Sequence, residues 1–218
     1  MTVLLTGYEP FGDHETNPSE RVASRLDGAE IAGERIVGEV LPVAFDRVDD
    51  RLRRLLDEHD PSAVVSTGLA AGRSAISVER VAINVANCAG TPDNDDAEPR
   101  DEPLDPDGPD ARFATLPVRG AVETLLDRGI PARLSNTAGT HCCNRALYAG
   151  VGAASGRTPE PPVGFVHLPL TPEAAARKAT DGEALAGGSV PPSMPVDTQI
   201  EAIETVIEVA LNGSSTHD

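Results

Sequence analysis

The sequence predicts an α/β fold with a twisted, mostly parallel sheet and helices on both of its faces. Short apolar runs typical of buried strands alternate with amphipathic segments typical of helices from one end of the chain to the other. The 218 residues contain no internal repeat and no linker-like change in composition. We therefore expect a single domain at residues 1–211 and a disordered tail at residues 212–218.

In the first half of the chain, apolar runs and capping residues predict strands and helices in turn. Asn17 followed by Pro18 indicates a helix start, because asparagine caps free N–H groups and proline fits the first helical position. Leu52, Leu55 and Leu56 form the apolar stripe of a second helix. The predicted order is a strand at 3–6, a helix at 17–26, a strand at 31–41, a helix at 47–58, a strand at 63–67 and a β-rich stretch at 75–85.

The second half begins with an acidic segment at 89–109, rich in proline and glycine, which predicts a long surface loop. The strand and helix patterns then return. Their predicted order is a helix at 118–128, a strand at 132–136, a helix at 141–154, a strand at 163–168 and an amphipathic helix at 198–211. Sites in such folds gather at the carboxyl ends of strands, so we expect one where the strands at 3–6, 63–67, 132–136 and 163–168 end.

The charge of the chain argues against nucleic acid as a partner. Asp and Glu number 35 against 18 Lys and Arg, which gives a net charge of −17 and repels phosphate backbones. Lys178 is the only lysine, and an acid-rich, lysine-poor composition resembles that of halophilic proteins, whose self-repulsion is screened by salt. An ordinary acidic cytosolic protein is the alternative.

No membrane contact and no secretion are expected. No apolar run reaches the roughly 18–20 residues that span a bilayer, and the N-terminus lacks the features of a signal peptide. The three cysteines, Cys88, Cys142 and Cys143, are an odd number, which argues against a disulfide framework. These features predict a cytoplasmic protein with free thiols.

Cys142 and Cys143 are candidate nucleophiles, because both fall in the first turn of the helix predicted at 141–154. Free N–H groups and the positive end of the helix dipole at that position favour a thiolate. The alternative is that each is a small buried hydrophobic residue. Position alone does not decide which of the two would react.

His167 and Glu79 are the candidates for a base and for the carboxylate that orients it. His167 closes an apolar strand, where a catalytic base is expected, although a structural histidine also fits. Glu79 places a charge within an apolar strand pattern, so it must be paired or functional. An ion pair with Arg73 or Arg80 is the alternative.

Metal and nucleotide sites are not expected. Cys142 and Cys143 lack the two-residue gap of zinc-binding pairs, and no second cluster exists. The glycine-rich segment 68–73 follows a strand, as anion-binding nests do, but it lacks the Gly-Lys-Ser/Thr ending of a P-loop. We expect a tight turn at the wall of the site.

Four blocks in one register resemble a known family from Val3 to about Leu211, with weaker support at 115–117 and 192–194. The blocks are Leu-Thr-Gly-Tyr-Glu-Pro-Phe-Gly at 5–12 with Asn-Pro-Ser at 17–19, Gly-Leu-Ala-Ala-Gly-Arg-Ser-Ala-Ile-Ser-Val-Glu-Arg at 68–80, Ser-Asn-Thr-Ala-Gly-Thr-His-Cys-Cys-Asn at 135–144, and Phe-Val-His-Leu-Pro at 165–169. They are similar to the pyroglutamyl-peptidase I, or pyrrolidone-carboxylate peptidase, family.

The resemblance implies a cysteine exopeptidase that removes N-terminal pyroglutamate from peptides. The family's nucleophile, the Cys before Asn, matches Cys143; its base matches His167 and its third catalytic residue matches Glu79. The implied reaction is thiolate attack, protonation of the departing amine by His167 and hydrolysis of the thioester. The resemblance also implies a three-layer α/β/α sandwich, a homotetramer, and no metal or cofactor.

For the substrate, the resemblance implies a sandwich of the flat pyrrolidone ring between two aromatic side chains, Tyr8 and Phe11. Tyr8 stands where the family usually has Phe, so its hydroxyl needs a partner. We expect hydrogen bonds to the ring amide from backbone groups of four residues: Gly68, Leu69, Ala70 and Ala71.

One segment departs from the family pattern. Before Pro92 the family commonly carries Arg and an apolar residue, whereas this chain has Ala89-Gly90-Thr91 and is one residue longer. Arg73 and Arg100 are candidates to replace that arginine. The alternatives to a peptidase are a catalytically degenerate member kept for binding or assembly, and an amidase for another amide.

Overall fold

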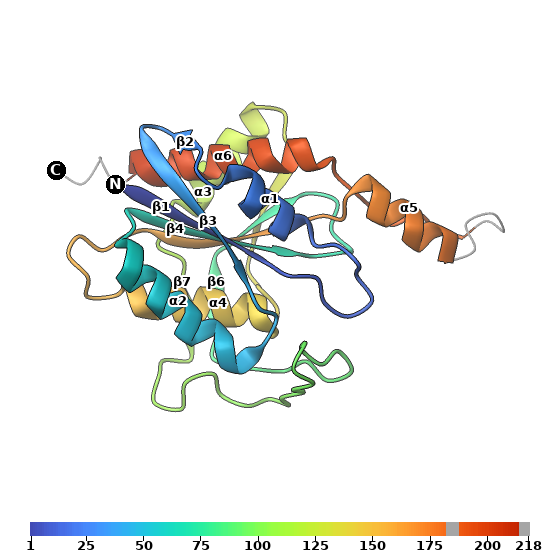
Figure 1. Cartoon of the computed structure of the whole chain (residues 1–218), viewed down its shortest axis with the longest axis horizontal. Helices are drawn as coiled ribbons and strands as arrows, with labels where there is room; N and C mark the ends of the chain where they lie inside the picture. The colour runs from blue at the N-terminus through green and yellow to red at the C-terminus, as the bar shows by residue number, and fades with distance from the viewer. Residues whose placement is uncertain (182–187, 214–218) are drawn as a thin grey trace.

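Figure 1 shows a central sheet covered by helices on both faces. The computed structural model describes residues 1–181 and 188–213. Across the main sheet the strands follow the order β2 (Glu30–Ile31), β3 (Glu34–Leu41), β1 (Thr2–Tyr8), β4 (Ala63–Leu69), β9 (Val163–Leu168), β5 (Ile76–Glu79) and β8 (Ala132–Ser135). A second sheet pairs β6 (Val81–Ile83) with β7 (Ala111–Phe113).

The main sheet is mostly parallel, as predicted. β1 runs parallel to β3 and β4, β4 to β9, and β5 to β8. Two pairs are antiparallel: β2 with β3, and β5 with β9. Since β5 and β8 run against β1, β4 and β9, the expectation that the strand at 132–136 ends at the same edge as the others is wrong.

The helices form two layers, which confirms the predicted α/β/α arrangement (Figure 1). One layer contains α1 (Pro18–Leu26), α3 (Val118–Asp127) and α6 (Val196–Gly213); the other contains α2 (Phe45–His59) and α4 (Cys142–Ala154). The shorter α5 (Pro172–Asp181) extends away from the sheet. In the described residues, no helix has both the length and the apolar character needed to cross a bilayer.

Alternation along the strands decides which side chains meet which layer. In β4, Val65 packs with the α1, α3 and α6 layer, whereas Val64 packs with the α2 and α4 layer. In β9, Phe165 faces the α2 and α4 layer, so His167, two residues later, faces the same layer. Gly68 lies four residues after Val64 in β4 and therefore on that face as well. Glu79 follows Val78, which packs on the opposite face of β5, so Glu79 also faces the α2 and α4 layer.

Two predicted strands are divided in the structure. The segment 31–41 forms the β2–β3 hairpin, because Ala32 and Gly33 both have positive φ, at 51° and 81°, which suits a two-residue turn. The segment 75–85 divides at Arg80 into β5 and β6, which belong to different sheets.

The C-terminal part of the chain differs from prediction at two places. The helix α5 was not predicted, although Thr171 followed by Pro172 is a start signal; the Thr171 hydroxyl accepts the N–H of Ala174 at 3.3 Å. The helix α6 continues to Gly213, so the tail expected at 212–218 is helical at its first two residues. The remainder, 214–218, lies outside the described residues.

Candidate active site

Glu79 and His167 come from neighbouring strands and meet on the face covered by α4. Glu79 lies opposite Phe165 in the antiparallel β5–β9 pair, one diagonal step from His167. Oε1 of Glu79 lies 2.7 Å from Nδ1 of His167, and both side chains are buried. A carboxylate at Nδ1 selects the tautomer with the proton on that nitrogen and leaves Nε2 free.

Cys143 is the second residue of α4, whose first turn is held by its neighbours. The Nδ1 atom of His141 accepts the N–H of Cys142 at 2.8 Å and caps the helix. The Nε2 atom of His141 lies 3.1 Å from the carbonyl of Thr91, so the neutral tautomer donates there. The amide of Asn144 bonds both backbone groups of Ile83 in β6.

Gly68 allows this helix turn to lie close to the sheet. It is paired with His167 in the parallel β4–β9 register. A Cβ at this position would lie 2.8 Å from Sγ of Cys143 and 2.9 Å from the ring of Phe165. The absence of a side chain on Gly68 therefore places the thiol over the strand that neighbours His167.

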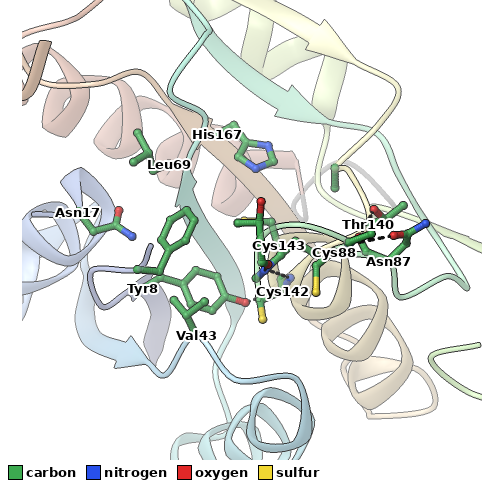
Figure 2. A pocket seen from close by; sticks show the side chains of 15 residues that line it. Tyr8, Asn17, Val43, Leu69, Asn87, Cys88, Thr140, Cys142, Cys143 and His167 are labelled. Atoms are coloured by element: carbon green, nitrogen blue, oxygen red, sulfur yellow. Dashed lines mark hydrogen bonds between the residues drawn. The ribbon is translucent and has the colours of Figure 1, made fainter. Parts of the chain in front are cut away.

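A cavity of about 520 Å³ opens at these groups. Figure 2 shows Tyr8 and Leu69 on one side, Cys88 and Thr140 on the other, and Cys143 and His167 between them. In the described part of the chain, the two histidines are the only titratable nitrogen bases among its lining residues, and no Asp, Glu, Lys or Arg contributes. The lining residues are Tyr8, Phe11, Asn17, Val43, Leu69, Asn87, Cys88, Ala89, Thr91, Ala138, Thr140, His141, Cys142, Cys143 and His167.

The pKa values of the central groups are set mainly by burial. Burial, and then the charge of Glu79, raise the pKa of the Cys143 thiol to about 12. Burial lowers the pKa of His167 below its ordinary value, although Glu79 opposes this shift. Burial favours the neutral form of Glu79 and raises its pKa, but the hydrogen bond and charge of His167, together with hydrogen bonds from Ser135 and Arg73, outweigh burial and lower the pKa of Glu79. The helix start favours a thiolate at Cys143, and burial acts in the opposite direction.

Three of the six expected substrate-binding residues line this cavity. Tyr8 and Phe11 line it, and the Tyr8 hydroxyl donates to the carbonyl of Cys142 at 2.7 Å, which supplies the partner it needs. Leu69 lines it as well, whereas Gly68 lies beneath the thiol of Cys143. Ala70 and Ala71 are not among the lining residues.

Arg73 and Arg100 occupy different environments. Arg73 lies 2.5 Å from Glu79 through Nη1, so the ion pair considered as an alternative for Glu79 coexists with its contact to His167. Arg100 pairs with Glu98 at the surface. Gly90, in the longer segment, has φ +83° and donates its N–H to Glu98 at 2.5 Å.

The sequence patterns did not assign roles to His141 and Asn144. Both adjoin the two cysteines in the chain, and a polar residue before a helix is a signal for a cap. Among residues 1–181 and 188–213, no three histidine, cysteine or carboxylate side chains converge in a way that could hold a metal ion.

Comparisons with known proteins agree on one family. The family model described as pyroglutamyl peptidase matches residues 1–213. The pyrrolidone-carboxylate peptidase of Pyrococcus furiosus is 42% identical over 211 residues, covering 97% of this chain and 98% of the relative. Pyrrolidone-carboxylate peptidase 2 of Photorhabdus laumondii is 42% identical over 213 residues, covering 98% and 93%. A crystal structure of the Pyrococcus furiosus pyrrolidone carboxyl peptidase matches with a TM-score of 0.92 at 40% identity, covering 98% and 99%.

Proposed function

The chain belongs to the pyroglutamyl peptidase family, and we propose that it is a cysteine peptidase that removes N-terminal pyroglutamate, with Cys143, His167 and Glu79 as the catalytic residues. The observation that carries the assignment of residues is their convergence at one cavity. A thiol and an imidazole border it, and a buried carboxylate holds the far nitrogen of the imidazole. This arrangement does not favour a degenerate member that only binds.

The reaction begins with proton transfer, because the thiol and the imidazole are both neutral at rest. As Sγ of Cys143 attacks the pyroglutamyl carbonyl, His167 takes the thiol proton, and the imidazolium is stabilised by Glu79. The imidazolium then gives that proton to the departing amine as the C–N bond breaks. Water, deprotonated by His167, hydrolyses the thioester, and the thiol is regenerated.

Backbone groups at the start of α4 are suited to hold the oxyanion. The first N–H groups of a helix have no intrahelical acceptor, and the N–H of Cys142 is already taken by His141. The N–H groups of Cys143 and Asn144 remain next to the thiol. They are the donors we assign to the tetrahedral intermediate.

The cavity suits a lactam ring. A pyrrolidone ring is small, flat and uncharged, and the cavity offers aromatic and aliphatic walls without a Lys, Arg, Asp or Glu side chain among its described lining residues. Tyr8 and Phe11 are proposed to contact the faces of the ring, and the backbone at Leu69, the one member of the segment 68–71 among the described lining residues, to form hydrogen bonds with the ring amide. The cavity then contacts only the N-terminal residue of the peptide.

Three further properties belong to the proposal. The protein acts in the cytoplasm, assembles as a homotetramer, and is adapted to high salt, as its net charge of −17 with a single lysine indicates. Its partners are peptides with N-terminal pyroglutamate, and no cofactor is required.

The test is release of aminomethylcoumarin from pyroglutamyl-aminomethylcoumarin in low and in molar KCl, with and without iodoacetamide. Alanyl and prolyl derivatives serve as controls for other amidase activities. Release from the pyroglutamyl substrate alone, abolished by the thiol reagent, is expected. Equal release from all three substrates, or none from any, contradicts the proposed function.

A further inference from the structure

Arg73 joins three segments of the catalytic site through one guanidinium group. It lies in the loop that follows β4, and its side chain is mostly buried. Nη1 lies 2.5 Å from Oε1 of Glu79 and 3.4 Å from Nδ1 of His167. Nη2 donates to the carbonyl of Thr137 at 3.2 Å, in the connection that leads from β8 to the helix of Cys143. One side chain thus contacts the orienting carboxylate, the base and the approach to the nucleophile.

The carboxylate of Glu79 has few other partners. Its Oε1 atom accepts from His167 and from Arg73, and the side chain of Ser135 in β8 also lowers the pKa of the carboxyl, while Oε2 has no hydrogen-bond partner in the described residues. The side chain has no exposed surface, and a buried carboxylate is costly unless charge and hydrogen bonds compensate it. A neutral His167 supplies only a hydrogen bond. Arg73 supplies the compensating charge.

The same guanidinium acts on the two groups that exchange the proton. His167 is faced by Glu79 from β5, by Cys143 from α4, by Arg133 from β8 and by Arg73 from the loop after β4. Glu79 raises the pKa of the Cys143 thiol and of His167, and Arg73 lowers both. An imidazole beside an unopposed carboxylate stays protonated to higher pH, where it cannot accept the thiol proton.

We infer that Arg73 is a positioning residue for the proposed hydrolysis: it holds Glu79 against His167, ties this pair to the loop before Cys143 and offsets the negative charge of Glu79. It is not among the residues that line the cavity, so it acts on the chemical step and not on substrate binding. The inference rests on the proposed function for its kinetic consequences. Its effect on the Cys143 thiol does not depend on any substrate.

The experiment compares Arg73→Met and Arg73→Lys with Arg80→Met. Arg80 is a matched control, because it follows Glu79 in the chain but forms no hydrogen bond or ion pair with Glu79 or His167 in the described structure. For Arg73→Met we expect kcat to fall about a hundredfold while KM changes less than about twofold. The decline of kcat/KM at low pH, the acid limb of its pH profile, should occur about one pH unit higher than in the wild type. Arg73→Lys should return the limb to its wild-type position without restoring kcat, because one ammonium cannot span all three contacts.

A second readout needs no turnover. The pH dependence of Cys143 alkylation by iodoacetamide, followed by peptide mass spectrometry to separate it from Cys88 and Cys142, should move to higher pH in Arg73→Met. If this variant does not fold, Arg73→Gln removes the charge and retains polar contacts. Unchanged kcat/KM and alkylation profiles in the charge-removing variant, or equal shifts in Arg80→Met, overturn the inference. A wild-type protein inactive on pyroglutamyl amides contradicts the proposed function, while the alkylation shift still decides the role of Arg73.

Discussion

The Sγ atom of Cys143 occupies the space that a Cβ on Gly68 would need, at a separation of 2.8 Å. Gly68→Ala should therefore displace the thiol or the ring of Phe165. We expect kcat to fall about a hundredfold and the free energy of unfolding to fall by about 1–3 kcal/mol. Release of aminomethylcoumarin and thermal melting measure the two effects.

Gly72→Ala is the control for that substitution. Gly72 lies in the loop after the same strand, and a Cβ built on it meets no atom within 4 Å. Wild-type kcat is expected. Full activity in Gly68→Ala contradicts the close approach of Cys143 to β4.

The two adjacent cysteines should respond differently to replacement by serine. Cys143→Ser removes the thiol that borders His167 and should abolish turnover. Cys142 is 1% exposed and packs in the apolar cluster beneath α4, so Cys142→Ser should retain turnover and lose about 1–3 kcal/mol of stability. Equal loss of activity in both variants contradicts the assignment of Cys143.

Tyr8→Phe isolates the hydroxyl that is bonded to the carbonyl of Cys142. It should cost about 1–2 kcal/mol of stability, since one buried hydrogen bond is lost while the ring remains. KM should stay near its wild-type value. The matched variant is Tyr148→Phe, which removes a hydroxyl bonded to Pro109 at 2.8 Å, away from the cavity. A large rise of KM in Tyr8→Phe but not in Tyr148→Phe contradicts a purely structural role for the Tyr8 hydroxyl.

The pH dependence of kcat/KM follows from His167, because this side chain must be neutral to accept the thiol proton. Because burial lowers its pKa, kcat/KM should decline only below about pH 6.5, the ordinary pKa of histidine. Glu79 raises the pKa of His167, so Glu79→Gln should move this acid limb to still lower pH. The same change should reduce kcat, since the imidazole loses its anionic partner. An upward shift of the limb in Glu79→Gln contradicts this account.

Salt should raise the melting temperature. With 35 acidic and 18 basic residues, repulsion between surface carboxylates destabilises the folded chain, and molar KCl screens it. Thermal melts in low salt and in molar KCl measure the effect. A melting temperature that does not respond to salt contradicts the proposed halophilic adaptation.

Apolar runs and amphipathic patterns were enough to predict most of the strands and helices. Glu79 stood out in the sequence because a carboxylate interrupts an apolar strand, and the structure buries it completely beside His167. The hairpin at Ala32 and Gly33 was missed because the segment 31–41 was interpreted as one strand, and the positive φ angles of these two residues show the reversal.

Relationships between distant segments could not be read from local patterns. The direction of β5 against β9 brings Glu79 to His167, yet no local pattern fixes strand direction. The contact of Gly68 with Cys143 depends on which helix covers which strand. Arg73 was recognised as a possible partner of Glu79, but its bond to Thr137 appears only when the loop before α4 is folded.

Because the described lining of the cavity is uncharged, the chemical form of a peptide's N-terminal residue decides whether the cavity suits it. A peptide that begins with glutamine carries an ammonium group, and the described lining residues include no carboxylate that could accept it from water. Once the glutamine cyclises, the amine becomes part of a neutral lactam that the cavity can hold. Under the proposed function, ring closure is therefore the step that converts such a peptide into a substrate.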